Sequence, residues 1–250
     1  MRYFAELAYN GTPFFGWQKQ PNQPSVQGCI EEALSLLLRE SINIVGCGRT
    51  DTRVHARQYF IHFDVSQPLH EKFLVRLNKY LPPEIAFRRF MPVLDDAHAR
   101  YHANYRSYTY YITKQKNPFA EQTRYLFPFI HQLDTDKMVE ATHLLMAHTA
   151  FFPFCKTNND LKSYDCQLYR CEWDFQENEY HLHIAANRFL RGMVRLVVGM
   201  CLNVGLGKVS LQEVQQALKE QSRLDMSWSV PPQGLFLEEI RYDKAKIAIR

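Results

Sequence analysis

The feature of this sequence that most limits its fold is the repeated change between two apolar periods, about two and about 3.6 residues, in both halves of the chain. Residues 58–65 place apolar side chains at every second position, as in a strand with one buried face. Residues 25–40 instead place Ile30, Leu34 and Leu38 on one face of a helix, with Ser25 as its candidate N-cap. The chain therefore mixes strands and helices.

The same two patterns extend over the remaining sequence. Further strands are expected at residues 2–9, 41–48, 85–93, 105–114, 166–175, 179–187 and 234–242. Further helices are expected at residues 70–82, 134–148, 188–207 and 210–221. This order predicts an α+β protein made of two similar lobes, residues 1–100 and residues 101–250.

Composition narrows the class of protein further. The net charge of +4 is spread evenly, with 12 Lys and Arg against 10 Asp and Glu in residues 1–100, so a polyanionic partner is permitted but not required. The six cysteines form no CxxC pair, and the first ten residues lack the apolar run of a signal peptide. The longest apolar stretch is too short to cross a bilayer. We expect a reduced, cytoplasmic protein with no membrane partner.

The most unusual short segment is GRTDTRVHA, residues 48–56, in which Asp51 stands between Arg49 and Arg53. Neighbouring cations favour the ionised form of a carboxylate, which suits a nucleophile or a general base. Taken alone, the motif is also typical of a turn in which the aspartate bonds to nearby backbone amides.

A second segment, residues 187–200, carries Arg188, Arg191 and Arg195 at helical spacing. On one helix these arginines form a stripe that fits phosphates or a buried acid. The alternative is a solvated helix face.

A third segment interleaves aromatic rings with Arg100 and Arg106. Flat rings beside cations are typical of sites that hold unstacked bases. For most of these rings packing in a core is the better interpretation, and one ring alone can be functional. The rings are Tyr101, His102, Tyr105, Tyr108, Tyr110 and Tyr111.

Metal and nucleotide motifs are missing from the sequence. The two histidine pairs, His98 with His102 and His181 with His183, stand outside any HExxH motif or cysteine set, so we expect no metal site. There is also no Walker P-loop, GxGxxG or GxSxG motif.

These segments, in this order, resemble the bacterial tRNA pseudouridine synthase A family over nearly the whole chain. The resemblance rests on YNGTPFFGWQKQ, SVQGCIEEAL, GRTDTRVHA, HARYHANYRSYTYYI, NRFLRGMVRLVVGMCLNVGLG and PPQGLFLEEIRY. It implies two lobes, each with an antiparallel sheet flanked by helices, and a cleft between them that receives tRNA. It also implies a homodimer that converts uridine to pseudouridine at positions 38, 39 and 40 of the anticodon stem–loop, with no metal or organic cofactor.

The resemblance also implies roles for individual residues. Asp51 matches the catalytic aspartate, and Arg49 is similar to the arginine that displaces the target base. Tyr108 matches the tyrosine that stacks on the uracil, and Arg195 the basic partner that keeps the aspartate ionised. By the same resemblance, contacts with tRNA are expected from Arg49, Arg53, His55, Tyr108, Arg188 and Arg191.

The chain departs from the family at one important position, since it reads DTRVHA where the family usually reads DAGVHA. If the glycine needs a positive φ, Arg53 costs steric strain or shifts the turn. Either the turn tolerates Arg53, which then adds a phosphate contact, or the loop is altered and activity is weaker; tolerance is the favoured outcome. Two rival functions follow: a non-catalytic tRNA-binding homologue, and a metal-dependent hydrolase that uses the histidine pairs.

Overall fold

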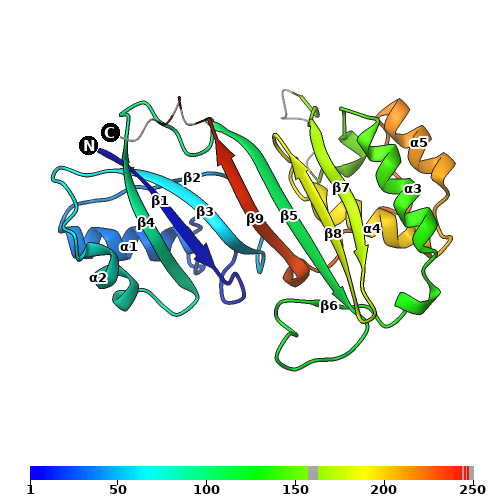
Figure 1. The fold of residues 1–250 in the computed structure, drawn as a ribbon, viewed down its shortest axis with the longest axis horizontal. Coiled ribbons are helices and arrows are strands. Elements are labelled where there is room, and N and C mark those ends of the chain that lie inside the picture. Colours follow the sequence, from blue (N-terminus) through cyan, green and yellow to red (C-terminus); the bar gives the residue numbers. More distant parts are fainter. Residues whose placement is uncertain (157–162, 244, 246, 248–250) are drawn as a thin grey trace. The chain divides into compact units, whose positions relative to one another are not determined.

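The computed structural model describes residues 1–156, 163–243, 245 and 247, and the chain divides into two compact units (Figure 1). The first unit holds Met1–Arg106 together with Phe236–Arg250, and the second holds Ser107–Leu235. These ranges differ from the expected lobes of residues 1–100 and 101–250, because the last strand returns to the first unit.

The first unit contains the strand order β4-β1-β3-β9, with β2 also paired to β3, and β1 runs antiparallel to β3 and to β4. The pairing of β3 with β9 is parallel, so this sheet is mixed and not antiparallel throughout as expected. Ser25 caps the first helix, as predicted, by accepting a hydrogen bond from the amide of Gly28. Its elements are β1 (Arg2–Tyr9), α1 (Val26–Leu38), β2 (Val45–Gly46), β3 (His55–Asp64), α2 (Phe73–Tyr80), β4 (Ile85–Val93) and β9 (Leu235–Tyr242).

Strand β3 is buried on both faces along its centre, which corrects the expectation of one buried face. Phe60 and His62 are both buried, although they alternate with the expected core positions. Tyr242 covers this second face: its ring packs edge-on against Phe60, and its hydroxyl donates to the carbonyl of Ala99 at 2.7 Å. These covering residues lie far from β3 in sequence, so local periodicity could not reveal them.

His62 makes the stability of the first unit depend on pH. Burial, assisted by the Arg2 cation and His98, lowers the pKa of His62 to about 4, whereas the imidazole of an unfolded chain titrates near 6.5. The unfolded state therefore binds more protons between these pH values. Stability is complete above about pH 6.5 and falls as the pH drops towards 4. We expect a loss of about 2 kcal/mol between pH 7 and pH 5, measured by urea denaturation.

The matched control for this effect is the exposed His131. His62→Asn is expected to remove most of this pH dependence, whereas His131→Gln leaves it unchanged. An equal loss of stability on acidification in the His62 variant would assign the effect to other groups.

The second unit contains the strand order β5-β8-β7, with β6 beside β5, and helices on one face of β7 and β8 (Figure 1). The expected hairpin is confirmed: β7 and β8 are antiparallel and place Asp174 opposite His181. Asp134 caps α3, as predicted. The elements are β5 (Ala103–Thr113), β6 (Tyr125–Leu126), α3 (Thr135–Met146), β7 (Leu168–Phe175), β8 (Glu179–Ala186), α4 (Met193–Gly205) and α5 (Leu211–Glu220), with short 3₁₀ turns at Ile130–Gln132, Phe152–Phe154 and Pro232–Gly234.

Helix α4 begins at Met193, five residues later than the expected helix at 188–207. Gly192 precedes it with φ of 72°, a left-handed conformation, so the helix cannot extend further towards the N-terminus than Met193. Nearly every residue of α4 is buried against the rest of the second unit. Among the described helices, none is both long and apolar enough to cross a membrane.

Candidate functional site

The segment that carries Asp51 is a loop between strands β2 and β3 of the first unit. Asp51 is half-buried, whereas Arg49 and Arg53 on either side are exposed. The carboxylate therefore lies at the surface of the unit, flanked in sequence by two guanidinium groups. This arrangement provides an accessible acid with a cation two residues away on either side in sequence.

Strand β1 and the loop that follows it hold the Asp51 loop in place. The amide of Trp17 donates to the carbonyl of Thr50 at 3.1 Å, and the amide of Arg53 donates to the carbonyl of Phe14 at 3.3 Å. The hydroxyls of Tyr9 and Thr50 lie 2.8 Å apart within hydrogen-bond reach. The backbone on both sides of Asp51 is thus fixed by a segment 33 or more residues away in sequence.

A second set of contacts fixes the beginning of the loop. The hydroxyl of Tyr59 donates to the carbonyl of Gly48 at 2.5 Å, and its ring stacks on Trp17 with centroids 4.1 Å apart. The guanidinium of Arg106 donates to the carbonyl of Cys47 at 3.1 Å. Burial raises the pKa of the Cys47 thiol to about 12, which keeps it neutral and excludes it as a reactive thiolate at neutral pH.

Arg53, which stands where the family usually has glycine, adopts a positive φ. Its φ is 62°, in the left-handed region where glycine is favoured and a side chain is strained. The turn therefore holds arginine in a glycine-like conformation. Of the two outcomes left open, the one in which the turn keeps its shape agrees with this geometry.

Replacing Arg53 with glycine is expected to stabilise the protein. Relief of left-handed strain contributes roughly 1–2 kcal/mol, and the greater freedom of glycine in the unfolded chain offsets roughly 0.5–1 kcal/mol. The net gain is about 0.5–1 kcal/mol, measured by urea denaturation. Arg39→Gly is the matched control, since Arg39 ends α1 with φ of 58°.

The two glycine variants differ in their expected effect on RNA. Arg39→Gly should leave tRNA affinity unchanged, whereas Arg53→Gly should weaken it and reduce its salt dependence. A loss of stability in Arg53→Gly would mean that the arginine side chain makes contacts worth more than the strain.

The expectation that His55 contacts tRNA does not agree with its burial. Its side chain is only 1% exposed, so it is not available to bind RNA at the surface. The ring stacks on Phe236 with centroids 4.5 Å apart, and Nδ1 accepts a hydrogen bond from the amide of Gly11 at 3.1 Å. His55 therefore joins the Asp51 loop to the segment that supports it.

The second unit positions Tyr108 and Arg195. Tyr108 lies on β5, half-buried, with its ring edge-on to Phe189 at 5.2 Å. Arg195 lies in the first turn of α4, where its Nε donates to the carbonyl of Val230 at 2.7 Å. The amide of Val230 in turn donates to the carbonyl of Arg195 at 3.3 Å, which fixes the arginine stem.

The neighbouring tyrosine, Tyr110, belongs to the core. It is fully buried, and its hydroxyl donates to the carbonyl of Pro231 at 2.7 Å. Burial raises the pKa of Tyr110 well above its ordinary value. Core packing therefore describes Tyr110, whereas Tyr101 is 73% exposed and the other four rings of this segment are half-buried.

Arg188 and Arg191 do not share a helical face with Arg195, which corrects the predicted stripe. Both are exposed and lie in the segment before α4, because the helix begins only at Met193. The predicted site residues thus form two sets. Arg49, Asp51, Arg53 and His55 lie in the first unit, and Tyr108, Arg188, Arg191 and Arg195 in the second.

Sequence reasoning missed the residues that support the loop. Gly11 and Gly16 allow the two loops to touch: a Cβ at Gly16 would lie 2.7 Å from the carbonyl oxygen of Thr50. Both glycines stand in YNGTPFFGW, which carries part of the family resemblance but no local signal of this contact. Arg106 was considered only as a cation beside aromatic rings, and its bond to Cys47 depends on tertiary structure.

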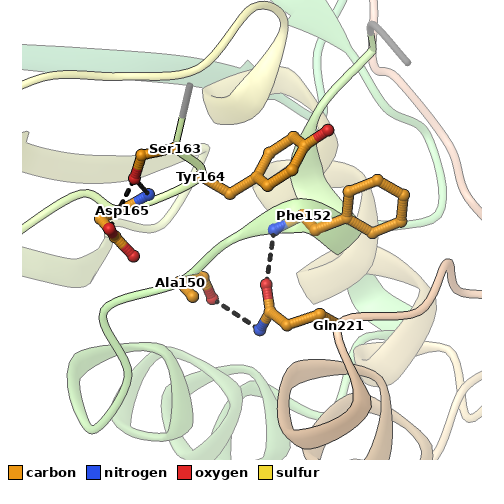
Figure 2. A pocket seen from close by; sticks show the side chains of 6 residues that line it. All are labelled: Ala150, Phe152, Ser163, Tyr164, Asp165 and Gln221. Carbon is orange, nitrogen blue, oxygen red and sulfur yellow. Dashed lines mark hydrogen bonds between the residues drawn. The ribbon is translucent and has the colours of Figure 1, made fainter. Parts of the chain in front are cut away.

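A shallow pocket of about 420 Å³ lies elsewhere in the second unit (Figure 2). Gln221 crosses its floor, donating to the carbonyl of Ala150 and accepting from the amide of Phe152. None of the predicted site residues lines it. The pocket is lined by Ala150, Phe152, Ser163, Tyr164, Asp165 and Gln221.

Comparison with known proteins assigns the family. The profile of a family described as tRNA pseudouridine synthase matches residues 148–243. A tRNA pseudouridine synthase A of Porphyromonas gingivalis is 41% identical over 246 residues, covering 96% of this chain and 97% of that protein. Its counterpart in Bacteroides fragilis is 43% identical, covering 96% of each chain, and that of Caldicellulosiruptor bescii is 34% identical, covering 94% and 97%. With such identity over nearly its full length, the chain belongs to the tRNA pseudouridine synthase A family.

Proposed function

We propose that this chain isomerises uridine to pseudouridine at positions 38, 39 and 40 of the tRNA anticodon stem–loop, with Asp51 as the catalytic carboxylate. The observation that carries the proposal is the Asp51 loop. A half-buried acid stands between two exposed arginines, on backbone fixed by hydrogen bonds from Trp17 and Arg53. The relatives named tRNA pseudouridine synthase A supply the substrate class.

The reaction requires little beyond such an acid. The C1′–N1 glycosidic bond breaks, the uracil rotates while it is held, and a new bond joins C1′ to C5. C5 loses its proton and N1 gains one, so the product is an isomer of the substrate and no oxidant or reductant is needed. An ionised carboxylate can attack C6 of the base or C1′ of the sugar, or remove a proton from the sugar, and all three routes remain open.

The remaining residues bring the target base to Asp51 and keep the Asp51 carboxylate ionised. A uridine in a stem must leave its stack before an acid can reach it, which gives Arg49 the role of displacing the base and Tyr108 that of stacking on it. Arg195 is the proposed cationic partner of Asp51. These roles require the two units to form one cleft, which is part of the proposal.

Binding of the RNA backbone is proposed for the exposed arginines Arg53, Arg188 and Arg191. Each cation that pairs with a phosphate releases counterions from the RNA, so affinity falls as salt rises. The burial of His55 leaves it a supporting role in the loop. We further propose a homodimer that acts in the cytoplasm, an environment that suits the six free thiols.

The experiment that tests this function follows the hydrogen at C5. The purified protein is incubated, with a chelator present, with an anticodon stem–loop RNA that carries tritium at C5 of the uridines. Tritium release at positions 38–40, mapped with RNAs that carry a single labelled uridine, is the expected result. Tight RNA binding without release would instead identify a non-catalytic tRNA-binding homologue. RNA cleavage in a parallel sample without chelator, absent when the chelator is added, would favour the metal-dependent hydrolase.

A further inference from the structure

Strands β7 and β8 of the second unit bring together three side chains that the sequence separates. Asp174 is opposite His181 in the antiparallel register, and His183 follows two residues later on the same face of β8. One ligand atom from each of the three residues lies within 4.8 Å of the others. Nδ1 of His181 is 3.7 Å from Oδ2 of Asp174.

The second ring nitrogen of each imidazole also has a polar partner. Nε2 of His181 lies 2.9 Å from a carboxylate oxygen of Glu179, which is itself paired with Arg124. Nδ1 of His183 lies 3.1 Å from the hydroxyl of Thr109 on β5. Metal-binding histidines usually use their second nitrogen in this way, because a hydrogen-bond partner there fixes the tautomer and the ring orientation.

We propose that Asp174, His181 and His183 form a binding site for one divalent transition-metal ion of the zinc class. Asp174 supplies a carboxylate oxygen, His181 its Nδ1 and His183 its Nε2. Two imidazoles with one carboxylate suit zinc or cobalt, and three protein ligands leave a fourth position for water. The ligand atoms of a tetrahedral zinc site lie about 3.3 Å apart, so metal binding requires side-chain rotations that shorten the present spacings.

The other histidine pair shows why the cluster is distinctive. Nδ1 of His98 accepts hydrogen bonds from the amides of Arg100 and Tyr101, and Nδ1 of His102 accepts one from the amide of His98. Those rings are engaged with backbone groups, and no acidic side chain of the described residues joins them within a three-ligand group. The double variant His98→Gln, His102→Gln is therefore the matched control.

The test measures metal binding itself. The purified chain, stripped with a chelator and kept reduced with a non-thiol reductant, is titrated with Co²⁺ and then with Zn²⁺. We expect one equivalent of cobalt to bind with visible absorption bands, and zinc to displace it. His183→Gln should lower the affinity by more than about a hundredfold, and Thr109→Val, which removes only the hydrogen-bond partner, by about tenfold or more.

The control variants decide the interpretation. Unchanged cobalt binding in the His98, His102 double variant supports the site, provided that all variants have the thermal unfolding midpoint of the wild type without metal. Binding that survives in His183→Gln, or that disappears in Cys29→Ser, would overturn the proposal, since Cys29 is the cysteine that is not fully buried. An absence of saturable binding would overturn it too.

Discussion

Asp51→Asn is expected to abolish tritium release from the labelled stem–loop while leaving RNA binding intact. Asparagine has nearly the same size and can keep the neighbouring hydrogen bonds, but it cannot act as an anionic nucleophile or as a base. Loss of a reacting group typically lowers kcat by at least about a thousandfold. Single-turnover release, with enzyme in excess over RNA, is the measurement, and a salt titration of RNA binding accompanies it.

The matched control for this variant is Asp64→Asn. Asp64 lies in the same unit at the end of β3, where it is exposed and paired with Arg2 at 2.8 Å. This substitution removes the same charge from the first unit and should leave the rate close to that of the wild type. Equal rates in wild type and Asp51→Asn would move the catalytic role to another residue, whereas equal losses in both variants would indicate a general effect of net charge.

Much of the fold follows from local patterns in the sequence. The helix caps Ser25 and Asp134 and the hairpin of β7 and β8 are confirmed, because caps and period-two patterns are local properties. The predicted start of α4 at residue 188 was wrong. The apolar periodicity continues through Gly192, although the backbone of Gly192 lies outside the helical region. Parallel pairing of β3 with β9 joins segments far apart in sequence and has no local signal.

The candidate site likewise has features that the local sequence predicts and others that depend on tertiary contacts. The motif around Asp51 predicts the reacting acid, which stays a prediction. The comparison with the glycine of the resembled family raised the question of a positive φ at residue 53, and Arg53 has a φ of 62°. The burial of His55 depends on Phe236, and the approach of Asp174 to His181 depends on strand register. Neither partner can be identified from one sequence, because periodicity describes which face a residue takes and not what covers it.

Gly11→Ala is expected to reduce activity by displacing the backbone of the Asp51 loop. A Cβ at Gly11 would lie 2.1 Å from the carbonyl oxygen of Val54, whereas real Cβ atoms stay beyond 3.0 Å, so the loop must move by about 1 Å. The amide of Val54 donates to the carbonyl of Asp51 at 3.2 Å, which passes the displacement to the acid. A misplacement of this size costs about a hundredfold in kcat, with a loss of stability above about 2 kcal/mol.

Gly48→Ala is the control that separates crowding from the loss of glycine, since a Cβ at Gly48 would meet no atom within 4 Å. It should change stability by less than about 0.5 kcal/mol and keep the rate. Gly16→Ala is the second variant. Its Cβ would press on the Thr50 carbonyl with a smaller overlap, but the φ of 92° at Gly16 adds backbone strain. A reduced kcat with normal RNA affinity is expected, together with a loss of stability. If both crowded variants fold and turn over like the wild type, the precise position of Asp51 does not limit the rate, and the supporting loop serves stability alone.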